Sequence, residues 1–238
     1  MRQVALNTHI SGTFNIELEN LRNSVLTMGG EVEQQLLDTL KALKLNHPGL
    51  AEKVVLNDLK INSMEIQIDE ECIRIIAKRH PTASDLRLIM TISKAITDIE
   101  RMGDEIERIA KLVTRNKLPS SDTIKSSMLL IGERVAAMMR GTFDAFARQD
   151  ESAALAVYKQ DNRIDSEYKR LLTYTTTEME KTTEDMQDWL DVLWAMRSLE
   201  RIGDRCKNVC EYVVYLTRGT DVRHTPLENI HQKLEDLS

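Results

Sequence analysis

Apolar residues recur three and four positions apart along most of this chain, the spacing that keeps one stripe on one side of an α-helix. The first such stripe consists of Phe14, Leu18, Leu21, Val25, Met28 and Val32. It predicts a helix from about Ser11 to about Asn46, where the sequence Asn-His-Pro-Gly stops it. The alternating steps also imply that the helix packs against a partner at a shallow angle, as in a helical bundle.

A second helix is predicted from about Gly49 to Arg79. The residues expected on its buried face are Val55, Leu59, Ile66, Ile73 and Ile76. It ends at His80, because the residue before a proline is steered away from helical backbone geometry. A third helix follows, with Thr82 or Ser84 as its cap. Its buried stripe is Ile89, Ile92, Ile96, Ile99, Gly103, Ile106, Ala110 and Val113.

The second half of the chain repeats this plan after a proline and several capping residues at 117–122. A fourth helix is expected from about Asp122 to Arg148, and a fifth from a cap at Asp150 or Ser152 to about Lys181. The sixth carries the stripe Trp189, Val192, Met196, Leu199, Gly203, Cys206, Cys210 and Val213. Each member lies 100 residues after its counterpart in the third helix, so the two stripes are in register.

The predicted fold class is all-α, with six long helices forming two tandem, internally repeated three-helix bundles. We expect the repeats at residues 8–117 and 121–218, followed by a C-terminal tail at 219–238. The duplication rests on the shared stripe and on two matching blocks, Glu-Arg-Met-Gly-Asp at 100–104 and Glu-Arg-Ile-Gly-Asp at 200–204.

Composition agrees with long helices, since 42% of residues are apolar, only 4% are aromatic, and the chain has 9 Gly and 4 Pro. No apolar stretch is long enough to span a membrane, and the N-terminus lacks the core of a signal peptide. The three cysteines contain no Cys-x-x-Cys pair and are expected to be small buried residues in a reducing compartment. A cytoplasmic protein is therefore expected. The net charge of −6 argues against general nucleic-acid binding.

Each repeat carries two carboxylates four residues apart on a helix, Glu100 with Asp104 and Glu200 with Asp204. Carboxylates at this spacing are neighbours and repel each other unless a positive charge lies between them. A glycine precedes each aspartate, although glycine in a helix costs about 1 kcal/mol relative to alanine. Its recurrence indicates that another backbone or an ion approaches closely there.

Oxygen-bearing side chains also line the preceding helix of each repeat. They are Asp58, Asn62, Glu65 and Asp69 in the first repeat, and Asp161 and Asp165 in the second. Antiparallel packing would bring these stripes to face the Glu/Asp pairs, with Glu107 on nearly the same line. An all-oxygen cluster suits hard cations such as Mg²⁺ or Mn²⁺, or iron. The predicted metal ligands are Glu200, Asp204, Asp161, Asp165, Glu100, Asp104 and Asp58.

Two other interpretations remain open at this stage. In the first, arginines neutralise the acids in a structural dimer without metal; the candidates are Arg101, Arg201, Arg108 and Arg205. In the second, the acids form a carboxylate-bridged metal enzyme. The sequence disfavours an enzyme, because it has no histidine near the acids, no glycine-rich phosphate loop and no nucleophile elbow. No catalytic residue is predicted. No convergent basic pocket is visible either, so direct phosphate sensing is not expected.

Several stretches together resemble the PhoU family of phosphate uptake regulators over nearly the whole chain. They are residues 14–22 with Met28-Gly29, residues 81–88, and the blocks at 100–104 and 200–204. The resemblance implies two three-helix bundles in a cytoplasmic homodimer that binds metal ions (Mg, Mn, Fe or Zn) through the Glu-x-x-x-Asp motifs. Family members often have asparagine four residues beyond the motif. Asn208 fits and Arg108 does not, so the second site is expected to be the better metal site.

The resemblance also implies a function without catalysis. PhoU-like proteins are negative regulators of phosphate uptake and of the phosphate-starvation regulon. The implied partners are the ATPase subunit of the phosphate ABC transporter and a sensor histidine kinase, between which the protein would act as a scaffold. No nucleic acid is expected as a partner, and contact with the membrane would come only through these proteins.

Overall fold

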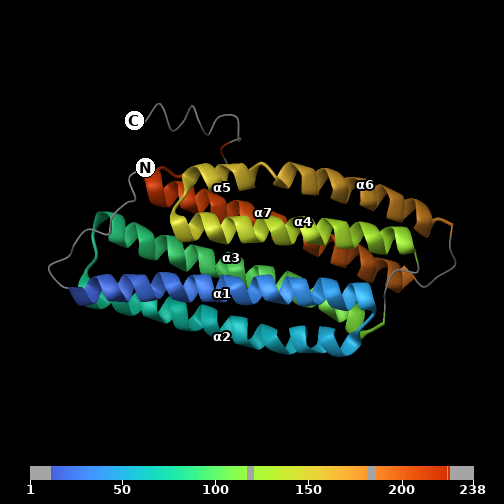
Figure 1. Cartoon of the computed structure of the whole chain (residues 1–238), viewed down its shortest axis with the longest axis horizontal. Helices are drawn as coiled ribbons and strands as arrows, with labels where there is room; N and C mark the ends of the chain where they lie inside the picture. Colours follow the sequence, from blue (N-terminus) through green and yellow to red (C-terminus); the bar gives the residue numbers. More distant parts are fainter. Residues whose placement is uncertain (1–11, 117–120, 182–185, 224, 226–238) are drawn as a thin grey trace.

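A computed structural model of the chain describes residues 12–116, 121–181, 186–223 and 225. Every regular element in these ranges is an α-helix, as the sequence predicts. The helices are α1 (Gly12–Leu45), α2 (Pro48–Arg79), α3 (Ala83–Thr114), α4 (Asp122–Arg148), α5 (Glu151–Tyr158), α6 (Asp161–Met179) and α7 (Met186–Arg218). All run along the long axis of the molecule, with α1–α3 on one side and α4–α7 on the other (Figure 1). No helix in these ranges combines the length and apolar character needed to cross a bilayer.

The two bundles are joined by a wide interface. The most extensive pairing in the molecule is between α3 and α7, and α1 packs on α4 beside it. Buried side chains from both bundles form one continuous hydrophobic core. The α1–α4 approach is close: a Cβ added to Gly132 would lie 2.3 Å from the Leu40 side chain. The repeats are therefore two halves of one packed body.

Three of the four predicted stripes are confirmed, because every predicted position in α1, α3 and α7 is buried. The helix ends also follow the predicted signals. His47 caps α2 by accepting a hydrogen bond from the Leu50 N–H at 3.0 Å, and Asp150 caps α5 in the same way. His80 ends α2 in the left-handed conformation, with φ of 48°. The three cysteines are buried and unbonded to one another, as expected.

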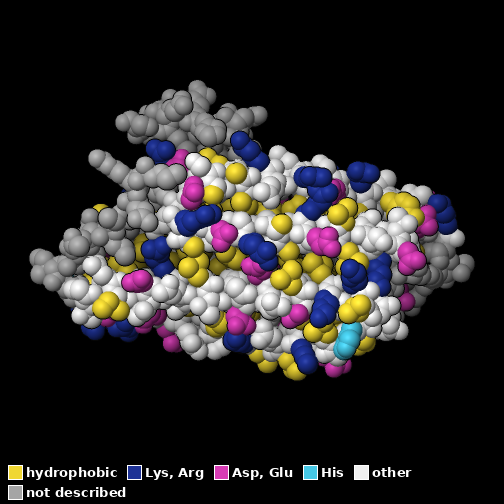
Figure 2. Space-filling model, viewed as in Figure 1, with side chains coloured by type: hydrophobic (Ala, Val, Ile, Leu, Met, Phe, Trp, Pro, Cys, Tyr) yellow, Lys and Arg dark blue, Asp and Glu magenta, His cyan; other side chains and the backbone are white. Residues whose placement is uncertain are grey.

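The predicted buried face of α2 is wrong at three of its five positions, while Val55 and Ile76 are partly buried and pack against the core. Leu59, Ile66 and Ile73 are 71%, 56% and 61% exposed. The residues that are buried instead are Ala51, Val54, Asp58, Ile61, Ile68, Cys72 and Ile75. Both isoleucine series repeat every seven residues, so periodicity could not decide which one faces the core. Apolar side chains also reach the surface elsewhere, scattered among charged ones on the face drawn in Figure 2.

The predicted fifth helix is interrupted and forms α5 and α6. At the break, the Gln160 N–H bonds to the Val157 carbonyl, and the Arg163 N–H bonds to the Gln160 carbonyl. These are bonds to the third residue back, so the chain makes one tighter turn there. Neither glycine nor proline marks the position, so the break could not be predicted from the sequence.

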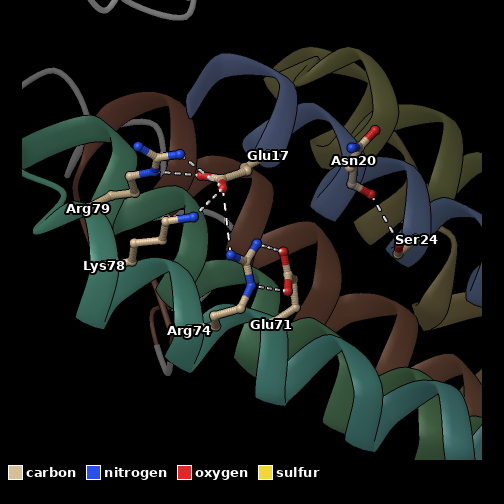
Figure 3. A network of polar contacts seen from close by, with 7 residues as sticks. All are labelled: Glu17, Asn20, Ser24, Glu71, Arg74, Lys78 and Arg79. Atoms are coloured by element: carbon tan, nitrogen blue, oxygen red, sulfur yellow. Dashed lines mark hydrogen bonds and ion pairs between the residues drawn. The ribbon is translucent and has the colours of Figure 1, made fainter. Parts of the chain in front are cut away.

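One polar contact ties the end of α2 to the start of α1 (Figure 3). Nε and Nη2 of the Arg79 guanidinium donate hydrogen bonds to Glu17, at 2.7 and 3.1 Å. Arg74 and Lys78 lie within 3.7 Å of the same carboxylate. The Arg79 hydrogen bond is the main cause of a lowered pKa at Glu17. This cluster fixes the register of the two helices at their ends.

Some predictions fall outside the described residues. They concern the helix start near Ser11, most of the segment joining the repeats at 117–120, and the tail beyond residue 225. The boundaries proposed for the two repeats and the tail therefore stay predictions at these positions.

Acidic clusters and the repeat interface

A buried aspartate from the preceding helix approaches the glycine of each Glu-x-x-x-Asp motif. A Cβ added to Gly103 would lie 3.1 Å from Oδ1 of Asp58, and one added to Gly203 would lie 3.1 Å from Oδ1 of Asp161. The predicted close approach is thus made by a carboxylate. In both repeats the glycine provides the space that this carboxylate needs against the helix.

The first acidic cluster consists of Asp58, Glu100, Asp104 and Glu107. Asp58 is only 6% exposed, and burial, together with Asp104 and Glu107, raises its pKa to about 6. Burial also raises the pKa of Glu100, and Asp104 adds to the rise. Glu107 pairs with Lys111 at 2.6 Å. Among the described residues, Glu100 and Asp104 form no ion pair, although the charge of Arg101 acts on Glu100 and opposes the rise in its pKa.

The second acidic cluster consists of Asp161, Asp165, Glu200 and Asp204. Lys207, the counterpart of Glu107, lies inside it, 2.8 Å from Oδ2 of Asp161 and 3.8 Å from Asp204. Burial raises the pKa of Asp161, while Lys207 opposes the rise. Glu200 pairs with Arg197 at 2.5 Å. The second cluster therefore already contains cations from the protein itself.

Whether the clusters fit a metal ion can be tested on their unpartnered atoms. Oδ1 of Asp58, Oδ1 of Asp161 and Oε2 of Glu200 are buried and accept no hydrogen bond from the described residues. Such atoms are costly unless a cation or water meets them. Within the same residues, no three acidic, cysteine or histidine side chains form a ready-made metal site. The donor set suits a hard cation, and binding would require side chains to move toward it.

The rest of the predicted oxygen stripe on α2 also faces α3. Asn62 donates to Oδ2 of Asp58 at 3.3 Å. Further along, Asp69 accepts from the Ser93 hydroxyl at 2.9 Å, and Glu65 accepts from Thr97 at 3.4 Å. These two acids are paired with hydroxyl groups, and Glu65 lies close enough to the first cluster to raise the pKa of Glu100.

Arginines of the two motifs pair with different acids from those expected. Arg201 and Arg108 both bond to Glu105 at 3.1 Å, and the Ser198 hydroxyl donates to the same carboxylate at 2.6 Å. Glu105 is 7% exposed and lies on α3 at the interface with α7. Arg201 therefore joins α7 to α3, whereas Arg108 and Glu105 both lie on α3. Neither arginine pairs with an acid of the first acidic cluster.

A second buried carboxylate, Asp98, completes this interface. It accepts hydrogen bonds from Arg205 at 3.0 Å, Asn208 at 3.2 Å and Tyr212 at 2.8 Å, all from α7. Asn208 thus serves the repeat interface, and the structure does not place it among the acids of the second cluster. The role of Asp98 was not predicted, because only the packing of α7 against α3 buries it.

Seven basic residues converge on a groove between the repeats, with a volume of about 860 Å³. The expectation that no basic pocket converges was wrong. The basic residues are Arg101, Arg108, Arg197, Arg201, Arg205, Lys207 and Arg223. They come from positions far apart in the sequence, and the pairing of α3 with α7 brings them together. Asp104 and Asp204 line the same groove, so it adjoins both acidic clusters.

The fold and these clusters define a class of protein: a duplicated helical bundle with one acidic cluster per repeat. The family model for the PhoU domain matches the chain twice, at residues 25–113 and 128–213. The chain belongs to the PhoU family.

Relatives and solved structures match along most of their length. The phosphate-specific transport system accessory proteins PhoU of Serratia marcescens and Escherichia coli K12 are 44% and 43% identical, over 94% of this chain and at least 92% of theirs. The crystal structure of PhoU from Pseudomonas aeruginosa has a TM-score of 0.83 at 44% identity. It covers 87% of this chain and 100% of that one. The crystal structure of the phosphate transport system regulatory protein PhoU from Streptococcus pneumoniae has a TM-score of 0.81 at 30% identity. It covers 88% of this chain and 99% of that one.

Proposed function

We propose that the protein is a negative regulator of phosphate uptake and of the phosphate-starvation regulon, acting without catalysis in the cytoplasm. The observation that carries the proposal is the match over 94% of the chain to proteins named as phosphate-specific transport system accessory proteins. The structural neighbour from Streptococcus pneumoniae is named a regulatory protein, which supports the same role.

In this proposal the protein binds hard cations through its acidic clusters, and Asp58, Glu100 and Asp104 are the leading ligands. The first cluster is favoured over the second, contrary to the ranking drawn from the sequence, because Lys207 already neutralises part of the second. A bound Mg²⁺, Mn²⁺, iron or Zn²⁺ ion would supply positive charge between α2 and α3. It would thereby offset the repulsion that raises the pKa values of Asp58 and Glu100.

The regulatory step we propose is scaffolding between the ATPase subunit of the phosphate ABC transporter and a sensor histidine kinase, by a homodimer of this chain. Such a scaffold must bind two states of the transporter with different affinity, since equal affinity shifts no equilibrium. An exposed apolar face of α2 supports a protein contact, because apolar side chains gathered on a surface often mark one. This face consists of Leu56, Leu59, Ile66 and Ile73.

A deletion of the gene in its host tests the regulatory role. Phosphate-repressed phosphatase activity would be measured in phosphate-rich medium, with complementation by the wild type. High activity in the deletion strain and low activity after complementation are expected. Intact repression in the deletion strain would exclude a negative regulator.

The same assay separates the acidic clusters from the fold. The doubly substituted variants are Glu100→Gln with Asp104→Asn, and Glu200→Gln with Asp204→Asn. A matched control, Glu133→Gln with Asp144→Asn, removes the same charge from exposed positions on α4. We expect the first variant to lose repression and bound metal most strongly, as measured by elemental analysis. Full repression and unchanged metal in both cluster variants would reduce these acids to a structural role.

A further inference from the structure

The groove between the two repeats concentrates positive charge in a chain whose net charge is −6. Seven of its lining residues are basic and four are acidic. Five of the basic residues are arginines on α3 and α7, and Arg223 comes from the segment after α7. A concave surface lined mainly by one sign of charge attracts ligands of the opposite sign.

The charges are arranged in two layers. The acids that pair with these arginines lie underneath, because the side chains of Asp98, Glu105 and Glu200 are only 7%, 9% and 10% exposed. The arginine side chains above them remain open, with Arg201 39% and Arg205 29% exposed. A ligand entering the groove would therefore meet these guanidinium groups before it met Asp98, Glu105 or Glu200, whereas Asp204, whose side chain is 47% exposed, lies at the surface of the groove.

The paired arginines keep most of their donors for a ligand. Arg197, Arg201 and Arg205 each donate to their carboxylate through Nη1. A guanidinium has five N–H donors in a planar fork, so Nε and Nη2 of each arginine remain available. The buried carboxylates fix the positions of these forks in advance, which lowers the entropy cost of binding.

Arg101 is the counterpart of Arg201 and lines the groove from α3. It is exposed, and it makes no hydrogen bond or ion pair with any described residue. It thus adds a guanidinium whose N–H donors are not used by any described residue, although its charge also acts on Glu100.

We propose that this groove binds an anion carrying several phosphate groups, such as a polyphosphate chain or the phosphate chain of a nucleotide. Guanidinium forks match the paired oxygens of phosphate better than a point charge does. A volume of about 860 Å³ is much larger than one orthophosphate needs, and the arginines are distributed along both helices. The groove shares Asp104, Asp204 and Lys207 with the acidic clusters, but its arginines belong to neither cluster.

Tripolyphosphate is a suitable probe, titrated calorimetrically into the full-length protein after removal of divalent cations, at about 150 mM salt to screen weak attraction. We expect it to bind at least about tenfold more tightly than orthophosphate. Arg101→Gln should weaken binding about tenfold, because it removes one set of charge-assisted hydrogen bonds. Arg101→Lys keeps the charge but loses the fork, so an intermediate loss is expected.

Arg148→Gln is the matched control, since Arg148 is an exposed arginine on α4 outside the groove. It should leave the affinity unchanged. An equal loss in Arg148→Gln and Arg101→Gln would overturn the proposal, as would equal affinity for orthophosphate and tripolyphosphate. Binding of pentaglutamate in place of tripolyphosphate would identify an acidic peptide site. No divalent cation, transporter or kinase takes part, so failure here would leave the proposed regulatory function standing.

Discussion

Asp98 of α3 accepts a hydrogen bond from Tyr212 of α7, with 2.8 Å between the phenolic oxygen and Oδ2. Arg205 and Asn208 donate to its other oxygen. Burial raises the pKa of Tyr212, and the neighbouring carboxylate raises it further, so the phenol stays a neutral donor. One buried side chain of the first repeat is therefore held by three side chains of the second.

Substitution of Asp98 should destabilise the whole protein. In Asp98→Ala the Arg205 guanidinium loses its partner at a largely buried interface, and we expect a loss of about 3 kcal/mol in the free energy of unfolding. Urea denaturation would measure it. Asp144→Ala, at an exposed position on α4, should change the value by no more than about 0.5 kcal/mol. Similar values for the two variants would mean that Asp98 contributes little to the interface.

Alanine at Gly103 should be harmful despite its better helix propensity. The new Cβ would lie 3.1 Å from Oδ1 of Asp58, so the carboxylate or the helix must shift. We expect a loss of about 1 kcal/mol and weaker Mn²⁺ binding. Gly30→Ala is the control, because no atom lies within 4 Å of a Cβ there. It should gain up to about 1 kcal/mol in thermal or urea unfolding. A gain at both positions would contradict this account of Gly103.

Cation binding at the first acidic cluster should depend on pH. Asp58 has a pKa of about 6, well above its ordinary value of 3.8, so a proton competes with a cation below pH 6. Manganese affinity should fall by up to about tenfold for each pH unit below 6, and vary little above pH 7 as far as this group is concerned. Titrations followed by electron paramagnetic resonance would show it. Asp58→Asn should lower the affinity and flatten this dependence; an unchanged profile would remove Asp58 from the site.

Glu211 should make the protein less stable as pH rises. Burial raises its pKa to about 7, although Lys207 and a hydrogen bond from Tyr158 oppose the rise. The folded state therefore binds the proton more tightly than the unfolded chain does. The stabilising effect of this proton is full below about pH 4.5, is lost as pH rises to 7, and stays lost above.

Glu211→Gln tests this effect directly. Relative to the wild type, the variant should be more stable at pH 8 than at pH 4.5, by on the order of 2 kcal/mol. Urea unfolding at both pH values gives the comparison. Glu133→Gln, at an exposed position, should show no such shift. A pH-independent difference between Glu211→Gln and the wild type would contradict the raised pKa.

The parts of the fold that could be predicted are those in which one face of a helix carries nearly all the apolar residues. The stripes of α3 and α7 are of this kind, and all their members are buried. In α2 two apolar series lie on nearly opposite faces, represented by Ile66 and Ile68, and the choice between them depends on the partner helices. The buried face of α2 includes the polar residue Asp58, so a prediction from hydrophobicity alone favoured the other face.

The acidic clusters could be predicted from the sequence, whereas the rest of the site could not. Their members lie one turn apart or on adjacent helices of one repeat, so local spacing brings them together. Asp98 and Glu105 are buried by a helix about 100 residues away in the sequence. The residues next to them in the sequence do not indicate this burial. The basic groove escaped prediction for the same reason, because Arg101 and Arg201 meet only after the repeats have packed.

The interface between the repeats is chemically one-sided. Positions 98 and 105 correspond to 198 and 205, yet α3 supplies Asp98 and Glu105 where α7 supplies Ser198 and Arg205. If two copies of α3 packed in this geometry, Asp98 of each would face Glu105 of the other, and two buried carboxylates would repel. Divergence after duplication has therefore made each repeat a specific partner for the other. It disfavours pairing between two like halves.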